Sequence, residues 1–173
     1  EPGTIPNTEI YKIFKEFVRE EGATSVLARR GMNIDLGGGA YLQILFPDRD
    51  VSGLSTNDGS IIAKLVYGNM SFLLPGDTTQ NIEKYLVSLD GGNLDVDVLK
   101  LAHHGSKTSS SELLLAVSTP KYAVISAGAK NRYGHPHKEV LERLAKYNIP
   151  ALGTYKEGTI VFESDGERVW RKK

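Results

Sequence analysis

Three clusters of polar residues in this sequence have the types and the spacing that could do chemistry. Gly76-Asp77 follows the apolar run SFLLP, His103-His104 follows VLKLA, and a loop with His135 and His137 follows YAVISA. Each run is typical of a buried strand, and loops at the carboxyl ends of strands in α/β sheets commonly share one ligand site. A carboxylate and imidazoles from separate loops can hold a hydrolytic Zn²⁺ or Mn²⁺ ion whose open positions acidify water. We therefore expect these clusters to reach one site.

Each candidate residue also has an ordinary structural interpretation. Asp77 lies where it could cap the helix expected after it. Adjacent histidines on a strand point to opposite faces, so at most one of His103 and His104 is expected to bind a metal unless the strand has already ended. His137 lies beside the start of a helix and needs no catalytic role. His135 sits in a Gly-His-Pro turn and is the better candidate for a substrate contact or proton donor.

The composition limits the other chemistries. The 173 residues are 40% hydrophobic and 24% charged, enough for one domain with a core, and they contain no cysteine. A disulfide framework, a thiolate zinc site and a cysteine nucleophile are therefore excluded, and any metal must be held by His, Asp or Glu. No apolar stretch approaches the roughly 20 residues that span a bilayer, and EPGTIPNTEI is not a signal peptide, so we expect a soluble chain.

The charges balance overall but not along the chain. The sequence holds 21 basic and 21 acidic residues, whereas residues 97–147 carry eight basic and four acidic ones and contain all four histidines. A basic neighbourhood around potential ligands favours an anionic, phosphate-bearing substrate. The alternative is the ordinary excess of lysines on a solvated helix surface.

The expected elements describe one domain over residues 1–173 with an α/β fold and a mixed sheet. A first helix runs from a cap at Asn7 or Thr8 to Gly22, and its apolar stripe is expected to be buried. The expected strands are 25–28, 41–46, a hairpin over 60–74 that turns at Gly68-Asn69, 94–102 and 122–127. The expected later elements are a helix after Asp77, a helix over 113–117 capped by Ser109 with Glu112, a helix over 138–147, and a β-meander with runs at 151–155, 159–164 and 167–171.

The sequence resembles the metallo-β-lactamase-like domain at the C-terminal end of the ComEC/Rec2 family of bacterial competence proteins. Three segments in this order carry the resemblance: GNMSFLLPGD, DVLKLAHHGSKTSSSELL and YAVISAGAKNRYGHPHKEVLERL. The resemblance covers almost the whole chain. It implies a four-layer αββα sandwich and a metal-dependent nuclease or phosphodiesterase that acts on DNA near the uptake channel.

The resemblance also implies roles for single residues. Asp77 would ligate or bridge Zn²⁺ or Mn²⁺ ions, one or two in number, and a histidine of the pair His103-His104 would complete the site. Further residues implied in catalysis or substrate binding are Ser106, Lys107, Asn131, Arg132, Tyr133 and His135. Among them, Lys107 and Arg132 would offset phosphate charge.

One motif of that family is absent from this sequence. The pattern His-x-His-x-Asp-His belongs to the first half of the family's fold, and no segment matches it. The chain therefore resembles the second half of the domain, with too few ligands for a closed dinuclear site. Half of such a sandwich would expose the inner face of its sheet, so we expect tight pairing with the missing half or with a second copy.

Two classes of function remain open at this point. The first is a metal-dependent phosphodiester hydrolase of the ComEC type, with a hydrolase of a small phosphoester or lactone as a variant. The second is a binding or structural module that keeps the fold and lacks the chemistry. Localisation follows the same resemblance: an extracytoplasmic domain of a membrane protein or a secreted protein if the chain is ComEC-like, and cytoplasmic otherwise.

Overall fold

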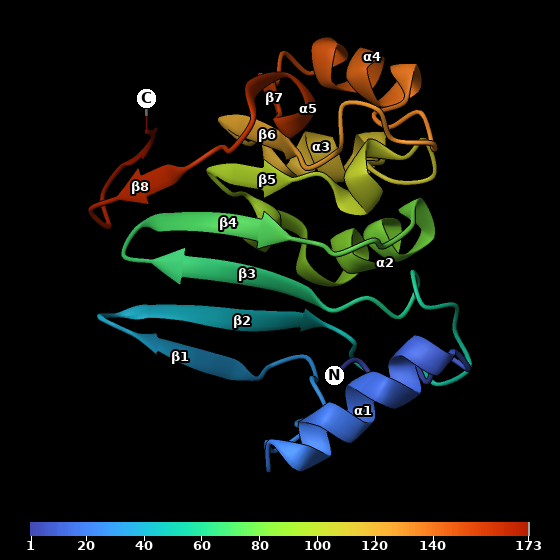
Figure 1. Cartoon of the computed structure of the whole chain (residues 1–173). Coiled ribbons are helices and arrows are strands. Elements are labelled where there is room, and N and C mark those ends of the chain that lie inside the picture. The colour runs from blue at the N-terminus through green and yellow to red at the C-terminus, as the bar shows by residue number, and fades with distance from the viewer. Residues whose placement is uncertain (173) are drawn as a thin grey trace.

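The computed structural model describes residues 1–172 and has an α/β fold with one mixed seven-stranded sheet (Figure 1). The strands of this sheet are β1 (Asn33–Gly37), β2 (Ala40–Phe46), β3 (Ile62–Tyr67), β4 (Met70–Leu74), β5 (Val98–Lys100), β6 (Tyr122–Ile125) and β7 (Ala151–Gly153), and they lie side by side in chain order. Strands β1 to β4 pair antiparallel, whereas β4 to β7 pair parallel. The expected mixed α/β sheet is confirmed.

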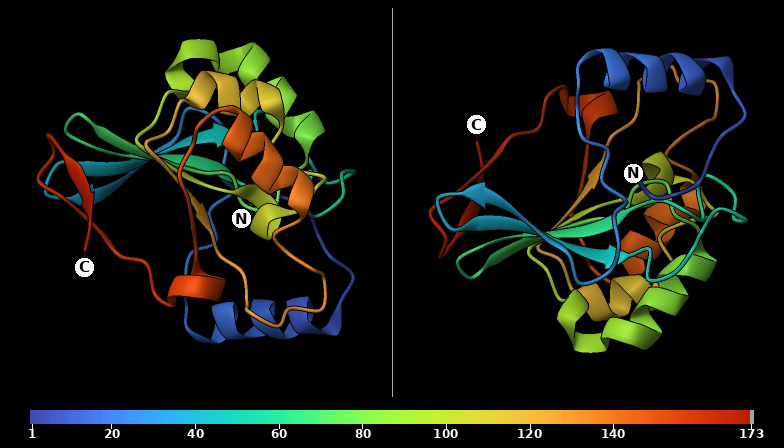
Figure 2. Two further views of the ribbon diagram at one scale, coloured as in Figure 1. Left: turned by 90° about the horizontal axis from the view of Figure 1, so that it is seen from above. Right: turned by 90° about the horizontal axis from the view of Figure 1, so that it is seen from below.

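Helices on one face of the sheet enclose the core. The helical elements are α1 (Glu9–Glu20), α2 (Gln80–Asp90), the 3-10 turns η1 (Gly91–Leu94) and η2 (Ala102–Gly105), α3 (Glu112–Ser118), α4 (Lys138–Lys146) and α5 (Thr154–Glu157). Figure 2 shows α2, α3 and α4 together on one side of the sheet and α1 on the other side. The core joins the sheet residues Leu73 and Leu99 to Leu86, Leu115 and Leu144 of the three helices. This burial is the main stabilising contribution to the fold.

The other side of the sheet carries an apolar surface that the helices do not cover. The strand register aligns one row of apolar side chains across six strands: Ile34, Leu42, Leu65, Phe72, Val98 and Tyr122. We call this row and its apolar neighbours the open face. The exposed part of the open face is at β1, where Ile34 and Leu36 are 47% and 52% exposed. Further along the row, Val98 is 3% exposed and Phe162 lies against Phe72 and Tyr122. On the helix side of the same strands the aligned pair Gln43 and Lys64 is polar, so the hydrophobic alternation favours burial of the open face.

Helix α1 begins where the sequence predicts but is not buried. Thr8 caps it by accepting a hydrogen bond from the Tyr11 backbone N–H. None of its residues is buried, and Ile10 and Phe17 are 81% and 60% exposed. The expectation that α1 buries its apolar stripe is therefore wrong for the described chain, because no described element packs over that stripe.

The first expected strand is also wrong. Residues 25–28 form no strand, and β1 lies eight residues later, where the glycine turn at 37–39 pairs it with β2. Residues 26 and 28 instead bond to the N-terminus: the Ala28 N–H donates to the Glu1 carbonyl and the terminal amine donates to the Val26 carbonyl. An apolar run of this length cannot reveal that its backbone partner is residue 1.

Two further differences concern the second half. The cap of α3 is Ser111, which accepts from the Leu114 N–H, whereas the Ser109 hydroxyl donates to the carbonyls of Ala102 and Ser106. The terminal meander is wrong in part, because β7 joins the main sheet parallel to β6 and α5 follows it. Only β8 (Phe162–Ser164) and β9 (Val169–Arg171) form a separate hairpin.

Candidate functional site

The loops that follow β4, β5 and β6 bring one carboxylate and four imidazoles together. Asp77 Oδ1 lies 3.7 Å from His104 Nε2. The His135 ring centroid lies 5.7 Å from that of His103, 6.4 Å from that of His104 and 4.9 Å from that of His137. The parallel order of these strands places their carboxyl ends at one edge of the sheet, which is why residues far apart in the chain meet there.

The proton of His104 is fixed by its backbone partner. His104 Nδ1 lies 2.7 Å from the Ser126 carbonyl oxygen, which can only accept, so Nδ1 carries the proton. When the ring is neutral, Nε2 therefore presents a lone pair to the Asp77 carboxylate. Two acceptors that face each other attract a proton or a cation between them. A carbonyl that orients one ring nitrogen while the other stays free is also the usual arrangement of a metal-binding histidine.

The two adjacent histidines do not follow strand alternation. Strand β5 ends at Lys100, and His103 and His104 have φ values of 48° and 57°. This left-handed backbone turns both rings toward His135. Nδ1 of His103 is buried and has no hydrogen-bond partner within residues 1–172.

Burial and neighbouring imidazoles favour the neutral form of His135. Burial, followed by the neighbouring imidazoles of His137, His103 and His104, lowers the pKa of His135 below its ordinary value of 6.5. The nearby Asp77 opposes this effect. His135 is therefore unprotonated at neutral pH and can accept a proton.

A buried carboxylate that the sequence analysis did not identify holds the loop after His104. Glu83 on α2 is 1% exposed, and its two oxygens accept hydrogen bonds of 2.6 Å from the backbone N–H groups of Ser110 and Ser111. Arg143 on α4 donates to three carbonyls of the same loop, at residues 107, 109 and 110. The available signal was the spacing: Glu83 lies three residues before the buried Leu86, on the apolar side of α2.

The remaining expected site residues fall into two groups. Ser106 is 5% exposed and bonds to Thr108 inside the loop, and the Asn131 side chain bonds to the backbone of Gly128 and His135. These two residues hold the loops through their hydrogen bonds. Lys107, Arg132 and Tyr133 are exposed: the Lys107 N–H donates to His137 Nδ1, and the Arg132 guanidinium donates to the Tyr133 hydroxyl.

A pocket of about 370 Å³ opens beside the histidines. Its lining residues are His104, Ser126, Ala127, Gly128, Asn131, Tyr133, His135 and Thr154. His104 therefore belongs both to this pocket and to the pair that it forms with Asp77.

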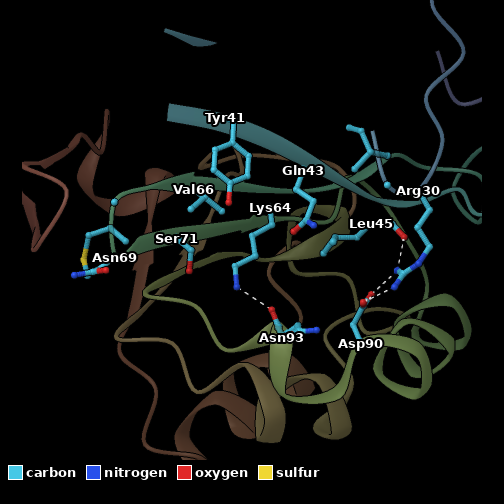
Figure 3. A pocket seen from close by; sticks show the side chains of 14 residues that line it. Arg30, Tyr41, Gln43, Leu45, Lys64, Val66, Asn69, Ser71, Asp90 and Asn93 are labelled. Atoms are coloured by element: carbon cyan, nitrogen blue, oxygen red, sulfur yellow. Dashed lines mark hydrogen bonds and ion pairs between the residues drawn. The ribbon is translucent and has the colours of Figure 1, made fainter. Parts of the chain in front are cut away.

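A second pocket, of about 410 Å³, lies on the helix side of β2 and β3 and contains none of the expected site residues (Figure 3). Its charged groups already have partners, since Lys64 donates to the Asn93 and Asp95 carbonyls and Arg30 pairs with Asp90. The histidine cluster is therefore the better candidate site.

The donors of the cluster suit a metal ion in kind but not in number. Asp77 and His104 offer a carboxylate oxygen and an imidazole lone pair. Within residues 1–172, no group of three or more His, Asp or Glu side chains is arranged to hold a metal ion. The pair therefore fits part of a coordination sphere, and further ligands would have to come from elsewhere.

Comparison with known proteins finds relatives with competence names. The chain is 36% identical over 144 residues to ComE operon protein 3 of Bacillus subtilis, 36% over 160 residues to competence protein ComA of Neisseria gonorrhoeae, and 34% over 155 residues to recombination protein 2 of Haemophilus influenzae. These matches cover 83%, 92% and 90% of the chain but only 18%, 22% and 19% of the relatives. The chain thus spans about a fifth of the curated relatives it matches.

No family model matches the chain. Among the described helices, none has the length and apolar character needed to cross a bilayer.

Proposed function

Because this chain belongs to the ComEC/Rec2 family of competence proteins, we propose that it takes part in DNA uptake as the second half of a metal-dependent phosphodiesterase. The observation that carries the enzymatic part is the pair of acceptors, Asp77 Oδ1 and His104 Nε2, which face each other at 3.7 Å. A cation bound between these two acceptors would interact favourably with both.

Asp77 and His104 are the residues that would hold a Zn²⁺ or Mn²⁺ ion. When bound, the ion would polarise a phosphoryl oxygen and acidify water. The unprotonated His135 beside the pair would take up a proton during the reaction. Lys107 and Arg132 would supply positive charge for the phosphates of the substrate.

The missing ligands and the open face support one common explanation. In this proposal the chain forms one β-layer and one helical layer of a metallo-β-lactamase-like αββα sandwich. A second layer, encoded outside these 173 residues or supplied by another chain, would cover the open face and add the remaining ligands. Its support is the apolar row from Ile34 to Tyr122 and the unburied stripe of α1.

Mn²⁺ titration of ¹⁵N-labelled chain tests the metal site. We expect paramagnetic broadening centred on the backbone signals of Gly76, Asp77 and His103 to Gly105. Asp77→Asn should remove this broadening, whereas the matched change Asp165→Asn, in the distant β8–β9 turn, should leave it unchanged.

The same variants decide between the two classes of function. Loss of broadening in Asp77→Asn, together with loss of single-stranded DNA cleavage once the open face is covered by its partner layer, would support the enzyme. If broadening is absent both in the original chain and in the chain bound to its partner layer, the protein is a binding module. The small number of metal donors in the described residues would then explain why it binds no metal.

A further inference from the structure

Three of the residues that line the pocket beside the histidines carry flat rings: His104, His135 and Tyr133. The rings of His104 and His135 are inclined by only 19°, and those of His135 and Tyr133 by 23°. Their centroids are 6.4 Å and 5.7 Å apart. The pocket therefore has three near-parallel aromatic rings in its lining.

The rest of the lining is the chain at Ser126 to Gly128, with Asn131 and Thr154, and the Ser126 carbonyl adjoins the His104 ring. The Thr154 hydroxyl is occupied there, because it accepts from the Ala127 N–H at 3.0 Å and lies 2.9 Å from the Ala127 carbonyl. Among the described residues, no Lys, Arg, Asp or Glu lines the pocket. A lining with three aromatic rings and no Lys, Arg, Asp or Glu suits a planar, uncharged group rather than a phosphate.

The position of the pocket indicates that its planar ligand is attached to a phosphate. His104 lines the pocket and also faces Asp77, so the pocket opens beside the place where a phosphate would be attacked. The exposed Arg132 guanidinium lies over the Tyr133 ring, 4.9 Å from its centroid, so a base that stacks on that face would displace it, and the freed guanidinium could contact a backbone phosphate. A volume of about 370 Å³ lies within the range of small-ligand sites, which is about 300–1,000 Å³.

We propose that this pocket binds the nucleobase of the nucleotide next to the scissile phosphate of a DNA strand, with Tyr133 as its stacking residue. This assignment rests on the proposed function and adds to it a requirement for an unpaired base. A base inside a duplex has both faces covered by its neighbours, so the pocket selects single-stranded DNA or a strand end.

Binding of two oligonucleotides to the chain tests this assignment. The probes are labelled pentathymidylate and an abasic pentamer with the same phosphates, compared by fluorescence anisotropy at fixed salt. Because stacking of one base contributes about a 5- to 150-fold change in affinity, we expect pentathymidylate to bind more tightly by a factor in that range. Its binding should shift the amide signals of Ala127 and Gly128.

Three variants identify the residue. Tyr133→Ala should abolish the preference for the base-containing strand and leave the weaker, phosphate-driven binding of both pentamers. Tyr133→Phe should keep the preference, because it keeps the ring. Tyr41→Ala removes a tyrosine from the other pocket and should change neither affinity. Tyr133 is 61% exposed, so its replacement is not expected to unfold the chain.

The outcomes of these experiments distinguish failure of the base pocket from failure of the proposed DNA substrate. Equal affinity for the two pentamers, with shifts confined to residues 103–107, would overturn the base pocket and leave the DNA substrate standing. No binding of either pentamer would overturn both.

Discussion

At the scale of single residues, the site depends on groups that hold its loops and rings in position. Glu83 bonds to two consecutive backbone N–H groups at the start of α3, and these lie in the loop that follows His103 and His104. Ser126 fixes the tautomer of His104 through its carbonyl. Both contacts join elements that are more than twenty residues apart in the chain.

Glu83→Gln should destabilise the chain. The glutamine amide group offers one acceptor where the carboxylate offers two, so one buried backbone N–H loses its partner at a cost of about 1–3 kcal/mol. Burial raises the pKa of Glu83 in the folded state. The native state therefore binds this proton more tightly than the unfolded state, and the carboxyl contributes less stability as the pH rises from the unfolded pKa through the folded one.

Urea unfolding at several pH values measures this effect. The difference in unfolding free energy between the original chain and Glu83→Gln should be larger at acidic pH and shrink as the pH rises. The exposed Glu142→Gln on α4 serves as the control for loss of a surface carboxylate and should cost no more than about 0.5 kcal/mol. A Glu83→Gln cost that grows with pH would contradict the prediction.

At the scale of elements, α1 stands apart from every other helix. Its sequence pattern is that of a helix with one buried face, yet the face has no cover in the described chain. Its present stability comes from its cap and from surface ion pairs such as Lys15 with Glu1. Surface pairs of this kind contribute about 0–1 kcal/mol each.

Phe17→Ser on α1 should therefore leave the stability of the isolated chain within about 0.5 kcal/mol of the original, as for other exposed positions. Leu144→Ala on α4, a fully buried position, should cost about 2–5 kcal/mol. Thermal unfolding followed by circular dichroism compares the two. If Phe17→Ser costs as much as Leu144→Ala, α1 packs against its own chain in solution.

At the scale of the whole molecule, the helices α2, α3 and α4 cover only one face of the sheet. The row from Ile34 to Tyr122 continues across six strands, and its exposed part lies at β1, where Ile34 and Leu36 are 47% and 52% exposed. Exposed apolar patches of this kind commonly mark an interface. The polar pair Gln43 and Lys64 on the helix side shows that these strands were not simply apolar on both faces. The open face thus has the composition of an interior surface.

The isolated chain should associate, and Leu36→Glu should shift it toward the 18.9 kDa monomer because a charge is costly to bury in that interface. Sedimentation velocity over a concentration series measures the monomer fraction. Leu113→Glu, which is 46% exposed on α3, provides the control on the opposite side and should not change association. A monomer at all concentrations without any substitution would contradict the prediction.

The features that could be predicted from the sequence depend mainly on residues close together in the chain. The hairpin at Gly68-Asn69, the cap at Thr8 and the helix near 138–147 were predictable, because turn and capping residues act on their immediate neighbours. The meeting of Asp77 with His104 was predictable because strand ends share an edge. The carboxylate of Glu83, the cap at Ser111 and the partner of residues 25–28 were not, since each depends on contacts made by folding.

The C-terminal hairpin β8–β9 sets a border for whatever covers the open face. The Asn69 N–H donates to the Gly166 carbonyl at 2.6 Å, and a Cβ at residue 68 would lie 2.3 Å from that oxygen, so the two turns fit only with glycine there. Phe162 meanwhile rests against Phe72 and Tyr122. A layer that packed on the open face would meet this hairpin beside the Gly68-Asn69 turn and Tyr122, so the hairpin would limit how far such a layer extends along the strands.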